Sequence, residues 1–149
     1  AGTGFNKNLK KYKIKGKSIF DVWKMTLDEA IDFFEDIDKS ITKVCITASE
    51  IMLGHLQIGQ ATATLSGGEN IRIKIMKASK STAKVIGVDE PFKGLSNIEI
   101  DAVANYLNRI REKGKTLIVI DHSTGVEDYF SQWIQIENID NRLIGKQFK

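Results

Sequence analysis

The stretch TLSGGEN, residues 64–70, places two adjacent glycines at the predicted start of a helix. Ser66 and Glu69 have the spacing of a capping box, in which each side chain accepts a hydrogen bond from the other residue's backbone N–H. A capping box needs neither glycine, and a glycine in a helix costs up to about 1 kcal/mol relative to alanine. Glycines at a helix start expose backbone N–H groups where the helix dipole favours an anion. The stretch therefore predicts a phosphate-binding turn.

Two apolar strands predicted further along the chain end in polar side chains. KVIGVD (84–89) is followed by Glu90 and Pro91, and TLIVID (116–121) is followed by His122. Ligands of open α/β sheets bind at the carboxyl ends of strands. One carboxylate there can hold magnesium through water, and a second can orient or deprotonate an attacking water. An imidazole beside them could contact a terminal phosphate. The alternatives without a function are that the two acids form an ordinary acidic turn after the strand, and that the histidine makes a structural hydrogen bond.

The pattern of the chain predicts two parts, residues 1–80 and 81–149. The first part is mostly helical, with a capped helix that begins at Thr26 and another over about 39–52. The second part alternates helices and strands, includes a helix over about 97–112, and closes with a hairpin. Continuous apolar strands separated by helices predict a parallel sheet covered on both faces. The expected fold class is α/β, a helical subdomain followed by a partial parallel sheet flanked by helices.

Composition limits the function classes. The 149 residues suffice for one domain with a core, and no apolar run has the length of a membrane span. Cys45, the single cysteine, excludes an internal disulfide and a cysteine zinc site built from this chain alone, and favours a cytoplasmic location. The net charge of +3 does not by itself indicate nucleic-acid binding. The lysine-rich start is either a solvated hairpin or a phosphate-contacting arm. Its candidate nucleic-acid contacts are Lys10, Lys11, Lys13 and Lys15.

Together, the glycine turn and the two strand ends resemble the ABC-type ATPases. LSGGE (65–69) matches the signature sequence of that family, and VIGVDEP (85–91) matches its Walker B strand with the catalytic glutamate. GLS (94–96) falls at the D-loop position and His122 at the switch-histidine position. The combination is far more specific than any one motif.

The flanking sequence narrows the resemblance to the UvrA family, the damage-recognition subunits of bacterial nucleotide excision repair. The two stretches that carry it are YKIKGKSIFDVWKMTLDEAIDFF (12–34) and GHLQIGQATATLSGGE (54–69), and the similarity extends over about residues 2–136. The chain departs from the family at two places. Members of the family usually have threonines and a histidine around the D-loop, and a glutamine before the arginine of the signature helix, whereas this chain has other residues there. The differing residues are Phe92, Lys93, Ser96 and Ile71.

The resemblance implies a role for each matching residue. Ser66, Gly67 and Gly68 would contact the terminal phosphate of ATP held by an opposing P-loop. Asp89 would bind a magnesium ion through water, and it is the one metal-binding residue that the resemblance implies in this chain. Glu90 would position the attacking water and His122 would sense the γ-phosphate. The longer parent protein would add zinc-binding cysteines.

No P-loop pattern occurs in the sequence. The only Gly-Lys-Ser, residues 16–18, lacks the required earlier glycine because position 11 is lysine, and it is interpreted as a turn in the basic arm. The isolated chain is therefore expected to bind ATP poorly and not to hydrolyse it. The expected partners are a P-loop region of the same protein or of a second copy in a dimer, double-stranded DNA and other excision-repair subunits, with no membrane.

Two alternatives stay open at this point. One is a UvrA-like ATPase with a resistance or other non-repair role, and the other is a non-catalytic regulatory or interaction segment. Two further residues have only general expectations: His55 packs or faces solvent, and Arg72 either contacts phosphate or supports its helix.

Overall fold

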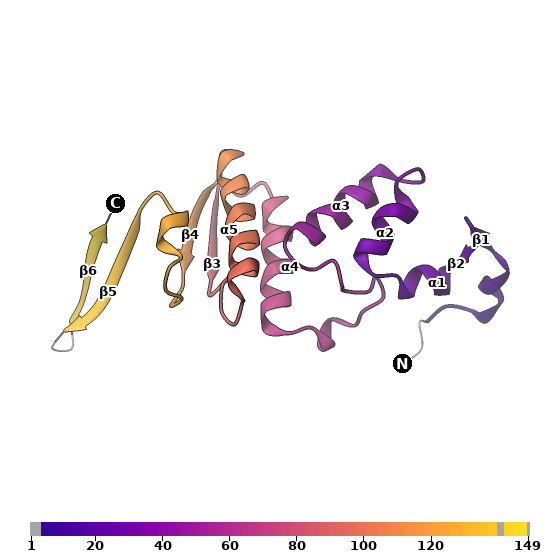
Figure 1. Ribbon diagram of the computed structural model, residues 1–149, viewed down its shortest axis with the longest axis horizontal. Helices are drawn as coiled ribbons and strands as arrows, with labels where there is room; N and C mark the ends of the chain where they lie inside the picture. Colours follow the sequence, from indigo (N-terminus) through magenta and orange to yellow (C-terminus); the bar gives the residue numbers. More distant parts are fainter. Residues whose placement is uncertain (1–3, 140–141, 149) are drawn as a thin grey trace.

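The computed structural model describes residues 4–139 and 142–148. Residues 1–3, 140–141 and 149 lie outside the described residues; they include the outer ends of the two predicted parts and two positions between the predicted hairpin strands. The molecule is elongated, with a small hairpin near one end, a long hairpin at the other, and the helices and a short sheet between them (Figure 1). Within the described ranges, no helix combines the length and the apolar character that crossing a membrane requires.

The basic arm folds into a short 3-10 helix and a tight hairpin. The helix η1 covers Lys7–Lys11, and the strands β1 (Lys13–Ile14) and β2 (Lys17–Ser18) pair antiparallel. The two residues between the strands, Lys15 and Gly16, both have positive φ, 46° and 76°. Two-residue hairpin turns favour this conformation because it matches the twist of the strands. Of the Gly-Lys-Ser stretch, Gly16 lies in the predicted turn, whereas the two residues after it form β2.

Three helices follow the arm: α1 (Ile19–Lys24), α2 (Leu27–Phe34) and α3 (Lys39–Glu50). Thr26 forms the predicted capping box at the start of α2. Asp38 caps α3, and its carboxylate accepts the backbone N–H of the second helical residue at 2.8 Å. Such caps satisfy N–H groups that have no partner within the helix, so these helix starts follow from local sequence.

The elements that carry the predicted site span the end of the first part and most of the second. A 3-10 turn η2 (Thr62–Thr64) leads into α4 (Gly67–Ser79), which is followed by β3 (Val85–Asp89), α5 (Asn97–Glu112) and β4 (Thr116–Ile120). β3 and β4 are parallel and pair in register from their first to their last residues. Because α5 connects the two strands, this is the α/β arrangement that the alternating pattern predicted.

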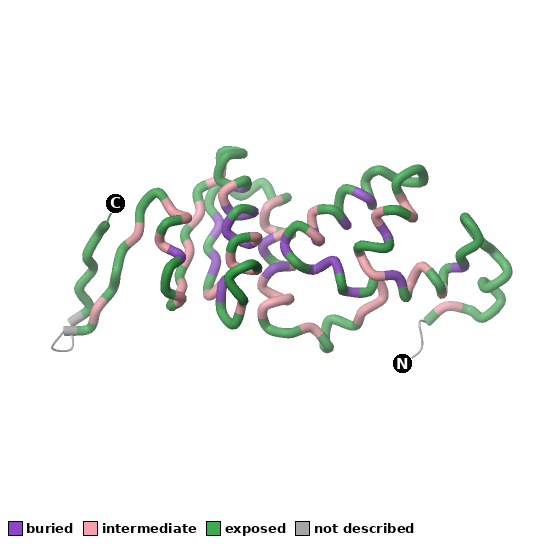
Figure 2. The backbone as a smooth tube through the Cα atoms, in the orientation of Figure 1, coloured by how far each residue is buried: buried purple, intermediate pink, exposed green. Residues whose placement is uncertain are grey.

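The sheet is covered on one face only within the described residues, which corrects the expectation of cover on both. Ile86 and Val88 of β3 are buried at 7% exposure, against a core built largely from α4 and α5 (Figure 2). On the other face Val85, Ile118 and Ile120 are 55–58% exposed. Apolar strand residues indicate a buried sheet, but they cannot show whether the covering residues belong to the same stretch of chain. The core includes Ile51, Leu53, Phe92, Val103 and Leu107.

The predicted closing hairpin is present and projects from the end of the molecule (Figure 1). After the short 3-10 helix η3 (Glu127–Tyr129), β5 (Trp133–Ile139) pairs antiparallel with β6 (Arg142–Phe148). The rings of Trp133 and Phe148 stack with centroids 4.3 Å apart. This pair fixes the open end of the hairpin, since cross-strand aromatic pairs stabilise a two-stranded ladder.

Candidate functional site

The signature turn has the capping-box geometry that its sequence predicted. Glu69 Oε2 accepts the backbone N–H of Ser66 at 2.7 Å, and Ser66 Oγ accepts the backbone N–H of Glu69 at 3.2 Å. The hydrogen bond from the Ser66 amide and a second one from His55 lower the pKa of Glu69 below its ordinary value. The carboxylate therefore stays ionised and holds the chain direction at the start of α4.

Neither glycine of the turn is required by packing. Gly67 is exposed, and a Cβ added there would meet no atom within 4 Å. A Cβ at Gly68 would lie 3.6 Å from Cδ2 of Leu95, an ordinary contact, and neither residue has positive φ. The open space beside Gly67 fits an approaching phosphate oxygen, because the first N–H groups of a helix have no partner within it.

The acidic end of β3 is shaped by the backbone of Glu90. Its N–H donates to Ile120 O at 2.8 Å, which extends the strand pairing one residue beyond Asp89. Its φ of 48° lies in the left-handed region, which costs a residue with a Cβ about 1–2 kcal/mol. Asp89 is exposed, and its carboxylate makes no hydrogen bond or ion pair with the described residues. One open carboxylate fits a magnesium ion that keeps most of its water ligands.

Lys93 contacts the candidate catalytic carboxylate. Its Nζ donates to Glu90 Oε2 at 2.6 Å, and this ion pair raises the pKa of the Lys93 ammonium. From the sequence, Lys93 stood out only as a departure from the family pattern. Its spacing of three residues from Glu90 was the available signal, since the turn after β3 brings those positions together.

Asp121, rather than His122, organises the end of β4. Its Oδ2 accepts the backbone N–H of Phe92 at 2.9 Å and its Oδ1 accepts that of Ser123 at 2.8 Å. Burial raises the pKa of Asp121, but the hydrogen bonds outweigh it and the pKa lies below its ordinary value. The imidazole of His122 is exposed and forms no hydrogen bond with the residues that the structure describes. Sequence reasoning missed Asp121 because its partner lies 29 positions away.

Arg72 supports the helices, which decides between the two roles left open for it. Its side chain is only 5% exposed, and Nη1 lies 3.3 Å from Oε1 of Glu99. The same nitrogen donates to the carbonyls of Ile51 and Met52 at 3.4 and 3.5 Å. Glu99 also forms the capping box of α5 with Ser96. Arg72 therefore joins the signature helix to the end of α3 and to the start of α5.

The four lysines proposed to contact nucleic acid are all exposed on the basic arm. Lys10 Nζ lies 5.7 Å above the centre of the Phe20 ring, whereas Lys15 Nζ forms an ion pair with Asp36 at 3.5 Å. The arm is separated along the molecule from β3 and β4, with α1 to α4 between them (Figure 1). The arm and the predicted phosphate turn are therefore two distinct places on the structure.

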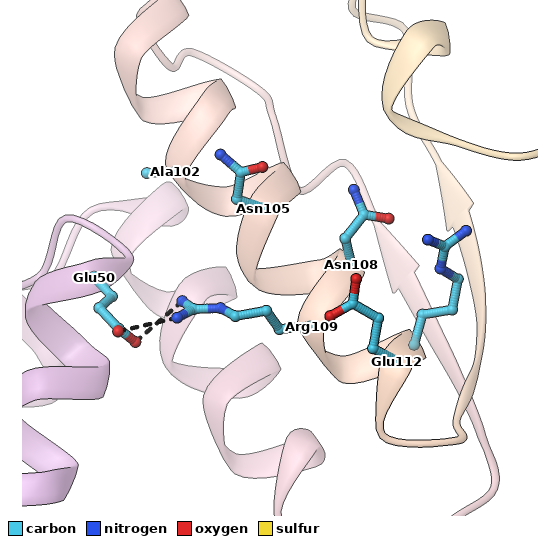
Figure 3. A pocket seen from close by; sticks show the side chains of 7 residues that line it. Glu50, Ala102, Asn105, Asn108, Arg109 and Glu112 are labelled. Atoms are coloured by element: carbon cyan, nitrogen blue, oxygen red, sulfur yellow. Dashed lines mark hydrogen bonds and ion pairs between the residues drawn. The ribbon is translucent and has the colours of Figure 1, made fainter.

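A surface depression of about 580 Å³ lies elsewhere, between α3 and α5. Figure 3 shows the guanidinium of Arg109 directed at Glu50 across it, with both nitrogen–oxygen distances at 3.0 Å. None of the residues predicted to bind nucleotide or metal lines this depression. It is a helix–helix contact rather than part of the predicted site.

The structure brings the predicted residues into two neighbouring groups. Because β3 and β4 are parallel, Asp89 at the end of β3, and Glu90 and His122 just beyond β3 and β4, lie at one edge of the sheet. The signature turn approaches the segment after β3, where Gly68 lies beside Leu95. Residues 90–96 therefore connect the two groups: the amide of Phe92 is hydrogen-bonded to the end of β4, and Leu95 lies beside the signature turn.

Known proteins resemble the chain in sequence and in fold, although no family model matches it. UvrABC system protein A of Rickettsia bellii is 39% identical over 128 residues, covering 84% of this chain and 13% of the relative. The corresponding protein of Thermus thermophilus is 36% identical with the same coverage. The crystal structure of UvrA2 from Deinococcus radiodurans matches with a TM-score of 0.84 and 32% identity over 97% of this chain and 18% of that one. The archaeal ribosome recycling factor aABCE1, at 23% identity and a TM-score of 0.58, shares the fold.

The signature turn at the start of α4, followed by the acidic and histidine-bearing strand ends, defines the ATPase module of an ABC-type ATPase. Within this class the chain belongs to the UvrA family, as the agreement in sequence and in structure shows. The chain spans about 13% of the length of the curated relatives it matches.

Proposed function

We propose that this chain forms the signature-bearing wall of a composite ATP site in a UvrA-type protein that recognises damaged DNA. The main support is the turn at Gly67, where an exposed glycine at a capped helix start leaves room for a phosphate oxygen. The opposing wall would carry the P-loop and would come from another region of the parent protein or from a second copy. A wall without a P-loop would bind Mg-ATP weakly, since the P-loop cradles the phosphates.

Each residue of the site would have one task. The Ser66 hydroxyl and the amides of Gly67 and Gly68 would hydrogen-bond the terminal phosphate. Asp89 would hold magnesium through water, and the bound ion would neutralise charge on the phosphate oxygens. Glu90 would orient the attacking water and accept its proton, which requires the carboxylate to leave Lys93. His122, exposed at the next strand end, would hydrogen-bond the γ-phosphate.

The catalytic assignment is tested by Glu90→Gln in the intact ATPase. The amide keeps the size of the side chain but cannot accept the proton, so hydrolysis should fall by at least about a hundredfold while nucleotide binding is retained. Glu112→Gln, at an exposed carboxylate at the end of α5, is the matched control and should hydrolyse at the wild-type rate. Wild-type turnover in Glu90→Gln would reject Glu90 as the base.

The DNA assignment depends on the basic arm. Exposed lysines around a hairpin can neutralise phosphates and release counterions, which makes binding dependent on salt. Replacing Lys10, Lys11 and Lys13 by glutamine should weaken duplex binding and reduce the slope of its salt dependence by about 0.9 for every phosphate that is no longer neutralised. ATP hydrolysis measured with and without a lesion-bearing duplex tests the repair role directly. Equal rates with intact and damaged DNA would favour a resistance or other non-repair role.

One observation favours a non-catalytic segment as the second candidate function. The short Lys93–Glu90 ion pair occupies the carboxylate that would activate water. Lys93→Thr frees that carboxylate, so an ATPase held back only by this pair should hydrolyse faster. If both Lys93→Thr and the wild type lack hydrolysis in the intact protein while nucleotide still binds, the non-catalytic alternative is favoured.

A further inference from the structure

The side chain of His55 reaches the signature turn from a separate loop. Its Nε2 lies 2.9 Å from Oε1 of Glu69, and the other oxygen of that carboxylate accepts the Ser66 amide. The side chain of Glu69 is only 14% exposed, whereas that of His55 is 61% exposed. His55 therefore lies on the solvent side of a nearly covered carboxylate and completes its hydrogen bonding.

The loop that carries His55 is held against residues 23–28, which include the end of α1 and the start of α2. Backbone N–H groups of that segment and of the loop make four cross-connections, each 2.8–3.0 Å long. They join Leu27 to Leu56, Asp28 to Gly54, Ile58 to Met25, and Gly59 to Trp23.

Two glycines make this contact close. A Cβ at Gly59 would lie 2.1 Å from the indole of Trp23, and one at Gly54 would lie 2.1 Å from Oδ1 of Asp28. Such distances exclude any side chain at either position without movement of its neighbours. The loop therefore moves together with α1 and α2, the two helices that follow the basic arm.

The hydrophobic core holds α4 further along its length. Leu56 of the loop and Ile75 of α4 belong to the same core cluster. At the first turn of α4, the polar contact from the loop is the one between His55 and Glu69. A hydrogen bond to an ionised partner in a partly covered place is stronger than one between neutral groups, so this contact can set the position of the turn.

We infer that His55 is a positioning residue, which acts through Glu69 to hold the backbone amides of Ser66, Gly67 and Gly68 in place. It thereby connects the signature turn to α1 and α2. The relevance to ATP rests on the proposed function, but the positioning itself does not. A shift of α1 and α2 would be transmitted to the signature turn through the His55 side chain.

The test compares His55→Leu, which lacks a ring nitrogen, with His55→Gln, whose amide can still donate to Glu69. In the 149-residue chain, amide hydrogen exchange of Ser66 should accelerate about fivefold in His55→Leu, as expected for loss of one hydrogen bond, and should return to within about twofold of wild type in His55→Gln. Lys74→Gln, at an exposed position on the same helix, is the control and should leave this exchange rate unchanged.

A double-mutant cycle gives a second readout. If His55 acts through Glu69, the effects of His55→Leu and Glu69→Gln on Ser66 exchange should be non-additive. Additive effects, or a His55→Gln variant that exchanges as fast as His55→Leu, would overturn the inference. Because exchange is measured without nucleotide, this failure is distinct from that of the proposed function, which wild-type hydrolysis in Glu90→Gln would reveal.

Discussion

Replacing Gly67 with alanine separates the needs of the fold from the needs of the site. A glycine required for folding would have positive φ or a close neighbour, and Gly67 has neither. Alanine restricts the unfolded chain and favours helix, so Gly67→Ala should raise the free energy of unfolding by about 0.4–1 kcal/mol. The gain should be visible as a higher midpoint in urea denaturation followed by circular dichroism.

The same methyl group would occupy the space through which a phosphate oxygen approaches. Hydrolysis by the intact ATPase should therefore fall by at least about tenfold in Gly67→Ala, and loss of one backbone donor to a charged oxygen can reach about 10²–10³. Gly59→Ala is the matched control for a structural glycine. Its Cβ would meet the Trp23 ring, so it should destabilise the chain by about 1–3 kcal/mol.

The reasoning would be refuted if Gly67→Ala destabilised the chain as much as Gly59→Ala does. The turn would then need its glycine for folding, and no ligand would be required to explain it. A stabilised Gly67→Ala variant that retained full hydrolysis in the intact protein would equally contradict a phosphate contact at this amide.

Three other predictions concern stability and reactivity. Arg72→Leu should lower the free energy of unfolding by about 2–3 kcal/mol, because it leaves Glu99 and two carbonyls without their donor, and a loss below about 0.5 kcal/mol in urea denaturation would contradict the bridging role. The pKa of Asp121 is lower in the folded chain than its ordinary value of 3.8, so the ionised carboxylate stabilises the fold at pH values above 3.8, and this contribution is lost as the pH falls through the folded pKa. Asp121→Asn should therefore be less stable than wild type at neutral pH, and it should lose less stability than wild type between about pH 4 and pH 2. Urea denaturation at each pH measures both effects. Burial raises the pKa of the Cys45 thiol, so a thiol-specific chromophoric reagent should react with it only in proportion to the unfolded fraction, and rapid labelling of the native chain would exclude this burial.

Short-range patterns determined much of this structure. The capping boxes at Thr26 and Ser66 join residues three positions apart, so composition and spacing alone located both helix starts. The strands over 85–89 and 116–120 and the helix over 97–112 also matched their patterns, because each is specified by its own apolar periodicity and by its end signals. These elements and the family motifs were readable from the sequence by itself.

Only the tertiary structure decided how the site is held. The contacts of Asp121 with Phe92, of Arg72 with Glu99 and of His55 with the signature turn join residues that are 29, 27 and 14 positions apart. Hydrogen bonds between such distant residues follow no sequence period, since they depend on how packed elements meet in space. The open face of the sheet is a second example, because apolar strand residues record a need for cover but not which residues provide it.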